Sequence, residues 1–272
     1  MLTVTTCLMT GGAAMKYKAF IFDIDGTLTD LKTWEIVPSA AEAINQLQEK
    51  GYPVIIASGR APHSAPKLAE SGIHPDYYVG SNGHIITDHE GKTIWGEFFD
   101  RDLYHRINDF CRKNNLGLFW KMEDCCYIVV DHPNMPKIME GLPREVVRTE
   151  VDYDELPNSG ALVGEEKDRQ LFMSEFAGQL ECVNGGLLLF DVNKLGVSKK
   201  NGLEVLLKML NIDPEDVMAF GDSENDIEML QMAGTAVVMG DGMERAKAAA
   251  DYIAEPTYAD GIMKTLKKFG VL

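Results

Sequence analysis

The sequence has few cysteines, and their spacing does not suggest pairs. Only five occur in 272 residues, at positions 7, 111, 125, 126 and 182. The number is odd and no Cys-x-x-Cys motif is present, so a disulfide framework is not expected. Adjacent Cys125 and Cys126 could form a redox pair, but the strand-like run that contains them favours simple burial. The pattern indicates a reducing compartment, and we expect a cytoplasmic protein.

The sequence also lacks a long apolar run and an excess of positive charge. No segment approaches the roughly 20 apolar residues of a transmembrane helix, so we expect no membrane association. Lys and Arg number 26 against 42 Asp and Glu, which gives a net charge of -16. Because this charge repels polyanions, nucleic acid is not an expected partner. A small phosphorylated ligand would need a local cation, either a side chain or a metal ion.

The remaining composition is that of an ordinary globular protein. Hydrophobic residues make up 45% and charged residues 25% of the chain, which excludes long disorder. At about 150 residues per domain, the length predicts two domains or one large interrupted domain. Residues 1–15 lack the charged start and apolar run of a signal peptide. We expect an unstructured extension there, with a short ordered tail as the alternative.

Alternating strands and helices predict an α/β fold with a Rossmann-like, doubly wound parallel sheet. The alternation consists of strand-like runs at 19–25, 53–58, 77–80, 217–221 and 236–239, with helical spacing at 39–50, 65–72, 203–210 and 225–233. Hairpin-like and mixed segments interrupt it and predict an inserted α+β domain. We expect a core domain at 16–82 and 194–272 and an insert at 83–193. Hinges are expected near Ser81–Gly83 and Asn193–Gly196, where Gly and Asn tolerate unusual backbone angles.

Polar side chains follow the predicted strands at several points. Asp23 and Asp25 end the first strand, and Asp222 and Asp226 follow a later one. Ligands bind beyond the carboxyl ends of the strands of an open parallel sheet. Carboxylates gathered there would repel one another, and a hard cation with oxygen ligands relieves that repulsion. We therefore expect these four aspartates to hold Mg²⁺. An EF-hand loop is the alternative, but Gly26 directly follows the second aspartate and a strand precedes the motif.

Two other segments predict binding of a phosphate group. Ser58 and Gly59 follow the second strand and offer a hydroxyl and backbone N–H groups, although a plain helix cap uses the same residues. The role of Arg60 stays open. Lys199 or Lys200, directly before a helix, could supply the fixed cation that an incoming phosphate requires. Paired lysines are more often a solvated surface.

These segments resemble the motifs of the haloacid dehalogenase (HAD) superfamily of phosphotransferases over residues 17–265. Asp-Ile-Asp-Gly-Thr-Leu at 23–28 resembles the first motif, Ser-Gly-Arg at 58–60 the second, and Val-Ser-Lys at 197–199 the third. Gly-Asp-Ser-Glu-Asn-Asp at 221–226 resembles the fourth, and the sequence after it is similar to the Cof-type subfamily. The insert lies between the second and third motifs, which is similar to a C2-type cap. In the third motif, the family usually has glycine after the lysine, where this chain has Lys200.

The resemblance implies a role for each motif. Asp23 would attack phosphorus to form an aspartyl-phosphate, and Asp25 would protonate the leaving group and then activate water. Ser58 and Gly59, together with Lys199 and Asn225, would hold the phosphoryl oxygens. Mg²⁺ would be bound by Asp23, the Asp25 carbonyl and Asp222, with Asp226 orienting the metal shell.

The predicted function is that of a Mg²⁺-dependent phosphatase acting on small phosphorylated metabolites such as sugar phosphates. The alternatives are a phosphomutase on the same core and a non-enzymatic metabolite-sensing protein. The cap is expected to choose the substrate, with His84, Glu123 and Asn184 as candidate contacts. Its aromatic residues are expected to form the cap core, namely Trp95, Phe98, Phe99, Phe119 and Trp120. The sequence makes no prediction of an oligomeric state.

Overall fold

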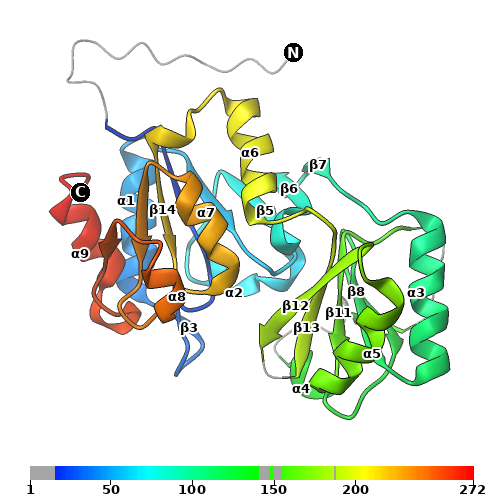
Figure 1. Ribbon diagram of the computed structural model, residues 1–272. Coiled ribbons are helices and arrows are strands. Elements are labelled where there is room, and N and C mark those ends of the chain that lie inside the picture. The colour runs from blue at the N-terminus through cyan, green and yellow to red at the C-terminus, as the bar shows by residue number, and fades with distance from the viewer. Residues whose placement is uncertain (1–15, 141–146, 150–154, 187) are drawn as a thin grey trace.

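Two β-sheets organise the chain, a larger one of eight strands and a smaller one of six. The computed structural model describes residues 16–140, 147–149, 155–186 and 188–272. The extension predicted at 1–15 lies outside these residues. The two sheets and their helices form two neighbouring lobes joined by short linkers (Figure 1).

The larger sheet is mostly parallel, as the alternating pattern predicts. In order across the sheet, its strands are β16 (Tyr252–Ile253), β15 (Thr235–Val238), β14 (Val217–Gly221), β1 (Ala19–Phe22), β4 (Val54–Ala57), β5 (Tyr77–Gly80), β6 (Ile85–Asp88) and β7 (Thr93–Gly96). The four residues of β1 are all buried, because helices cover both faces of this central strand. The pairs from β16 to β5 are parallel, and β6 and β7 are antiparallel additions at one edge.

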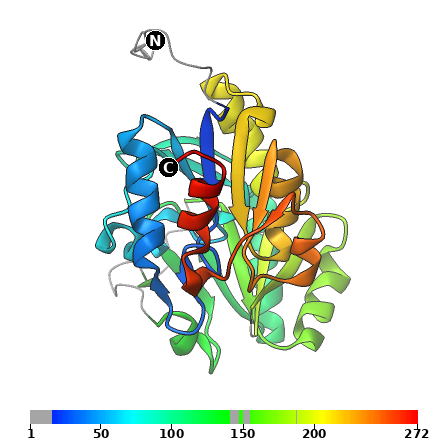
Figure 2. The same ribbon diagram turned by 90° about the vertical axis from the view of Figure 1, so that its left-hand side faces the viewer.

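Helices pack on both faces of the larger sheet, which confirms the doubly wound fold. One face is covered by α1 (Pro38–Glu49), α2 (Pro66–Glu70) and α9 (Gly261–Lys268). The other is covered by α6 (Lys199–Leu210), α7 (Ile227–Met232) and α8 (Glu244–Lys247). Figure 2 shows α1 and α9 on one side of the sheet, with α6 and α7 on the other. The strand order reverses at β1, which lies between β14 and β4. A ligand crevice is expected beyond the carboxyl end of β1.

The smaller sheet has its two longer helices on one face and a short one on the other. Its strands are β10 (Val147–Arg148), β9 (Cys126–Val130), β8 (Gly117–Lys121), β11 (Ser159–Val163), β13 (Leu189–Lys194) and β12 (Leu180–Gly186). The helices α3 (Arg101–Asn114) and α5 (Glu166–Phe176) bury one face of it. A short α4 (Met135–Ile138) follows β9. Among the aromatic residues assigned to this core, Phe99, Phe119 and Trp120 are buried, but Phe98 is exposed.

The insert begins later than the sequence analysis placed it. The β6–β7 hairpin lies inside the predicted insert at 83–193, yet β6 pairs with β5 and extends the larger sheet. The reason is that β6 hydrogen-bonds the otherwise free edge of β5, and Ile86 is buried with the side chains of α6. Trp95 on β7 packs against the same cluster, so it does not belong to the cap core. The first strand of the smaller sheet starts only at Gly117.

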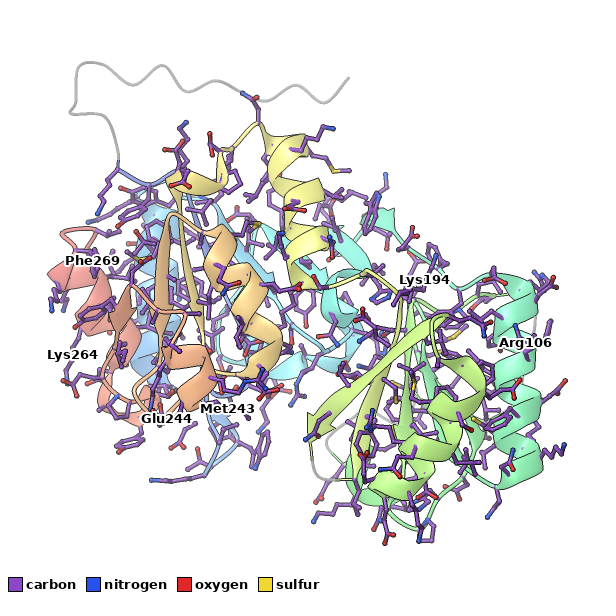
Figure 3. All side chains as sticks on the ribbon, in the orientation of Figure 1. Arg106, Lys194, Met243, Glu244, Lys264 and Phe269 are labelled. Carbon is purple, nitrogen blue, oxygen red and sulfur yellow. The ribbon has the colours of Figure 1, made fainter. Side chains whose placement is uncertain are left out.

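Both segments where hinges were expected contain positive φ angles, but the first joins β5 to β6 within the larger sheet, and only the second, with Gly196 at 75°, joins the two lobes. Ser81, Asn82 and Gly83 all have positive φ, at 52°, 54° and 94°. At Gly83 an added Cβ would lie 2.0 Å from the Ser198 carbonyl oxygen, so no side chain fits there. Lys194, at the junction of the two lobes in Figure 3, ties the return segment at 193–196 to the segment that follows β7. Its ammonium donates to the Glu97 carboxylate at 2.8 Å and to the Phe98 carbonyl oxygen at 2.9 Å.

His84, a candidate substrate contact, is buried beneath these segments as a neutral ring. Its Nδ1 lies 2.6 Å from the Ser81 carbonyl oxygen, and its Nε2 accepts the backbone N–H of Lys194 at 3.2 Å. Nδ1 must therefore carry the proton and Nε2 must be unprotonated. A second proton on the ring would face the Lys194 N–H. This arrangement gives His84 a structural role at the junction.

We expect His84 to make the folded state sensitive to acid. Burial is the largest cause that lowers the pKa of His84 to about 4 from its ordinary 6.5. As the pH falls from 6.5 to about 4, His84 takes up a proton in the unfolded chain but not yet in the folded protein. About 3 kcal/mol of folding stability is therefore lost by about pH 4. Urea unfolding at about pH 7 and about pH 4 should show a smaller loss in His84→Gln than in the wild type. The exposed His74→Gln control should behave as the wild type does.

Candidate active site

The first acidic motif lies at the carboxyl end of β1, where a tight turn brings it against the end of β14. The backbone N–H of Asp23 donates to the Phe220 carbonyl oxygen at 3.0 Å, which continues the pairing of the two strands. Gly26 has a φ of +84°, and an added Cβ there would lie 2.3 Å from Oδ2 of Asp222. A side chain at position 26 would thus keep the two acidic segments apart.

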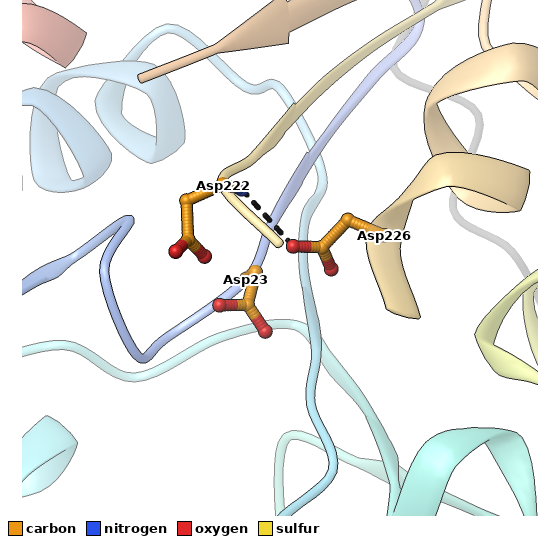
Figure 4. A group of neighbouring side chains, drawn as sticks. All are labelled: Asp23, Asp222 and Asp226. Carbon is orange, nitrogen blue, oxygen red and sulfur yellow. Dashed lines mark hydrogen bonds between the residues drawn. The ribbon is translucent and has the colours of Figure 1, made fainter. Parts of the chain in front are cut away.

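Three buried carboxylates gather at this point. Asp23, Asp222 and Asp226 each offer one oxygen, and these oxygens all lie within 4.8 Å of one another. Figure 4 shows them facing a common centre from the ends of two strands and the start of a helix. Asp226 Oδ2 accepts the backbone N–H groups of Asp222 at 3.0 Å and Ser223 at 3.1 Å. These bonds fix the loop that carries both acidic side chains.

Lys199 enters the same cluster from the first turn of α6. Its ammonium lies 2.6 Å from Asp23 Oδ1 and 2.6 Å from Asp226 Oδ1, and the residue is only 1% exposed. Lys200 instead points to the surface, where it faces Glu204 at 3.6 Å. Of the two lysines, Lys199, which the resemblance selects, is the one that lies at the acidic cluster.

The electrostatics of the cluster suit a divalent cation. Burial is the largest cause that raises the pKa of both Asp23 and Asp222, and the neighbouring carboxylates raise it further. Burial alone would lower the pKa of Lys199, but attraction to Asp226 and Asp23 offsets this and leaves it raised. Among the described residues, Asp222 Oδ1 has no hydrogen-bond partner although it is buried. A free buried carboxylate oxygen between acidic neighbours fits a Mg²⁺ ligand.

The segment at 58–60 places Arg60 against the second aspartate of the first motif. The guanidinium donates to both carboxylate oxygens of Asp25, at 2.8 and 2.9 Å. This paired geometry fixes the position of the Asp25 carboxylate. Ser58 is buried, and its hydroxyl accepts the backbone N–H of Arg60 at 3.1 Å. Ser58 thus organises this turn and does not cap a helix, because the 3₁₀ turn that follows begins only at Pro62.

A network that the sequence analysis did not anticipate joins the two lobes at this site. Asn82 accepts from Asn225 Nδ2 at 3.3 Å and donates to Asp191 Oδ2 at 3.1 Å. Asp191 Oδ1 accepts from the ammonium of Lys121 at 2.7 Å, which also donates to the Gly59 carbonyl oxygen at 2.9 Å. Asn82 was noted only as a linker residue, and nothing local distinguishes Lys121 or Asp191 from other charged residues.

Three of the four aspartates expected at the metal site lie together with Lys199, whereas the Asp25 carboxylate is held by Arg60 outside that group of three. Direct contacts join Asp23, Lys199 and Asp226, and Asp222 completes the cluster. Asn225 is connected to Gly59 of the loop at 58–60 by a chain of contacts through Asn82, Asp191 and Lys121. Two candidate cap contacts are exposed on the smaller lobe. Glu123 is exposed on the turn between β8 and β9, and Asn184 is exposed on β12. Glu123 lines a cavity of about 410 Å³ together with Phe98, Met122, Asp124, Glu155 and Leu156.

Comparison with known proteins is consistent with this geometry. The profile of the haloacid dehalogenase-like hydrolase family matches residues 20–266. YkrA of Bacillus subtilis, named as a phosphatase, is 30% identical over 95% of this chain and 100% of its own. A phosphoglycolate phosphatase of Methanobrevibacter smithii is 28% identical over 94% of this chain and 99% of its own. A solved HAD subclass IIB sugar phosphatase has a TM-score of 0.81 at 29% identity and covers 94% of this chain and 100% of its own. Two other curated relatives are longer proteins, and this chain spans about half of their length.

The chain belongs to the haloacid dehalogenase-like hydrolase family, with a Cof-type core and a C2-type cap. It is an enzyme of the phosphatase class within that family, and the alternative of a non-enzymatic sensor is not supported. Within the described part of the chain, every helix is too short or too polar to cross a bilayer.

Proposed function

We propose that the protein is a Mg²⁺-dependent phosphatase that hydrolyses small phosphorylated metabolites through an aspartyl-phosphate. The observation that carries the proposal is the buried ammonium of Lys199, 2.6 Å from both Asp23 and Asp226 and next to the unpaired oxygen of Asp222. A buried cation held among aspartates at a strand end matches the needs of a carboxylate nucleophile and a dianionic phosphate.

In the first step, a carboxylate oxygen of Asp23 attacks phosphorus while the bond to the leaving oxygen breaks. Asp25 gives its proton to that oxygen, so the alcohol departs neutral. In the second step, Asp25 takes a proton from water, and the resulting hydroxide attacks phosphorus. The bond between phosphorus and Asp23 breaks, which releases phosphate and restores the nucleophile. Arg60 acts as a positioning residue, because its paired contact holds the Asp25 carboxylate above the site.

The phosphoryl group would be held by side chains and backbone from three segments. Lys199 offsets the negative charge that meets at Asp23 during attack. Ser58 and Gly59 contribute the hydroxyl and backbone N–H groups of their turn, and Asn225 contributes its amide from the loop after β14. All of these groups are fixed by the folded core before substrate arrives, which is how preorganised donors lower a barrier.

Mg²⁺ fits among the aspartates of this cluster. Asp23, Asp222 and the Asp25 carbonyl would hold it, and Asp226 lies within reach with its oxygens already bonded to Lys199 and to the loop. A bound Mg²⁺ would supply charge neutralisation to the phosphoryl oxygens. The smaller lobe would act as a cap that excludes bulk water and contacts the leaving group.

We expect phosphate release to depend on Mg²⁺. Removing it with EDTA should lower kcat/KM about a hundredfold, because several kcal/mol of charge stabilisation are lost. Mg²⁺ should also raise the Tm, since it binds the folded cluster and relieves carboxylate repulsion. A panel of sugar phosphates and other phosphate monoesters, assayed for inorganic phosphate with and without Mg²⁺, checks the first point. Thermal unfolding with and without Mg²⁺ checks the second. Transfer of the phosphoryl group to a second hydroxyl without phosphate release would instead identify a mutase.

A further inference from the structure

The smaller sheet has one apolar face and one face with a polar end. The apolar face lies under α3 and α5 and carries Trp120, Leu162, Phe190 and Val192. On the opposite face, Lys121 of β8 stands directly across from Ser159 of β11. Asp191 of β13 stands across from Ala161, two residues from Ser159, and Asn193 lies two residues further along β13. Because side chains alternate along strands, these four polar residues share one face.

This polar end lies against the lobe of the larger sheet. The ammonium of Lys121 reaches the Gly59 carbonyl oxygen at 2.9 Å, within the turn assigned to phosphate binding. Asp191 is linked through Asn82 to Asn225 of the fourth motif. The side chains of Lys121 and Asp191 are each only 11% exposed. A leaving group attached to a phosphate in the site would therefore meet this part of the cap.

The charges at this point are already balanced. Lys121 contacts Asp191 at 2.7 Å, so the pair carries no net charge. Arg60 and Lys199, the cations of the two neighbouring core segments, are each in contact with aspartates of the core. A carboxylate or second phosphate on the leaving group would approach Asp191 and would find these cations occupied. Like charges at such short range in a buried site are strongly unfavourable.

Hydrogen-bonding capacity, in contrast, remains unused on the same face. Within the described chain, the hydroxyl of Ser159 and Oδ1 of Asn193 have no hydrogen-bond partner, although the residues are 0% and 3% exposed. Buried polar groups without partners are costly, and the hydroxyls of a ligand can satisfy them.

We propose that Lys121, Ser159, Asp191 and Asn193 form the leaving-group subsite of this phosphatase. The subsite selects monophosphates whose leaving group is neutral and hydroxylated, and it rejects those that carry a carboxylate or a second phosphate. This inference rests on the proposed phosphatase function. The ion pair of Lys121 and Asp191 discriminates between leaving groups, and the unpaired oxygens of Ser159 and Asn193 contact their hydroxyl groups.

Two substrates of equal length test the discrimination. sn-Glycerol 3-phosphate and 3-phosphoglycerate share a three-carbon chain and differ in a hydroxymethyl group against a carboxylate. The wild type should favour glycerol 3-phosphate in kcat/KM by at least about tenfold. Asp191→Asn leaves Lys121 as an unpaired cation, and the ratio should shift at least about tenfold toward 3-phosphoglycerate. Because the two rates come from the same protein, a general loss of activity cancels in the ratio.

Asp109→Asn is the matched control, since it removes the same charge from an exposed cap position whose side chain is 82% exposed. Its ratio should equal that of the wild type. If Asp191→Asn does not fold, Ser159→Ala provides a second test, because it removes an unpaired hydroxyl of the subsite. It should raise the KM for glycerol 3-phosphate at least about threefold without lowering the Tm.

Three results would overturn the inference: a wild type that prefers 3-phosphoglycerate, a ratio in folded Asp191→Asn within about twofold of the wild type, or an unchanged KM in Ser159→Ala. Hydrolysis of p-nitrophenyl phosphate separates these results from failure of the proposed function. If p-nitrophenyl phosphate is hydrolysed and the ratio does not move, the subsite assignment is wrong. If no phosphate is released from any ester, the phosphatase proposal is wrong, and so is the subsite assignment that rests on it.

Discussion

Replacing Asp23 with asparagine is expected to lower phosphate release by at least about a thousandfold, because the amide cannot serve as the nucleophile. The fold should survive the change. Asparagine has nearly the same volume, and Lys199 keeps its contact with Asp226 at 2.6 Å. The substitution also removes one of several carboxylates that repel one another at the buried site. We therefore expect the Tm of the metal-free variant to equal or exceed that of the wild type.

Single-turnover assays with a ³²P-labelled substrate measure this effect directly. Asp25→Asn is the informative comparison, since it keeps the nucleophile but loses the acid and base. It should still form a phosphorylated protein and release phosphate about 10² to 10⁴ times more slowly. Label attached to Asp23→Asn, or turnover retained in it, would show that another residue attacks phosphorus.

Replacing Lys199 with methionine is expected to reduce both activity and stability. Methionine fills a similar volume without charge, so Asp23 and Asp226 would remain buried without their shared cation. Leaving a buried charge without its partner costs about 3–5 kcal/mol of folding free energy. Loss of the charge beside the nucleophile should also lower kcat/KM by about 10² to 10³. Urea unfolding and phosphate release, measured with saturating Mg²⁺, check the two parts separately.

Lys200→Met is the matched control for this experiment. The neighbouring lysine carries the same charge on the same helix, but its side chain is 41% exposed and faces Glu204 at the surface. Its replacement should change stability by no more than about 0.5 kcal/mol and leave turnover unaffected. Equal losses in both variants would contradict the assignment of Lys199 to the site.

Much of the lobe of the larger sheet could be predicted from local sequence. Continuous apolar runs such as 19–22 and 54–57 predict buried parallel strands, and these are β1 and β4. The residues after the strands are polar, and the topology of an open sheet requires them to meet at one edge. That rule is sufficient to bring the segments that begin at Asp23, Ser58 and Asp222 together, because it depends on chain direction and not on side-chain detail.

Other features of the site depend on partners that the local pattern does not contain. The local sequence predicts no role for Arg60, since its contact with Asp25 spans 35 positions in the chain. The choice between Lys199 and Lys200 depends on which lysine the first turn of α6 directs inward. The boundary of the insert was wrong, because an antiparallel hairpin pattern is the same whether the hairpin joins the core sheet or a separate one.

By itself, the sequence indicated the class of the enzyme, because its acidic, hydroxyl and lysine segments follow one another in an order that resembles the motifs of the family. Only the tertiary structure decided how the cap meets these segments. The ion pair of Lys121 and Asp191 and the bridge through Asn82 join residues up to 143 positions apart. These contacts depend on the register of the smaller sheet and on the left-handed backbone at 81–83. Both are set by packing between segments that are far apart in the chain.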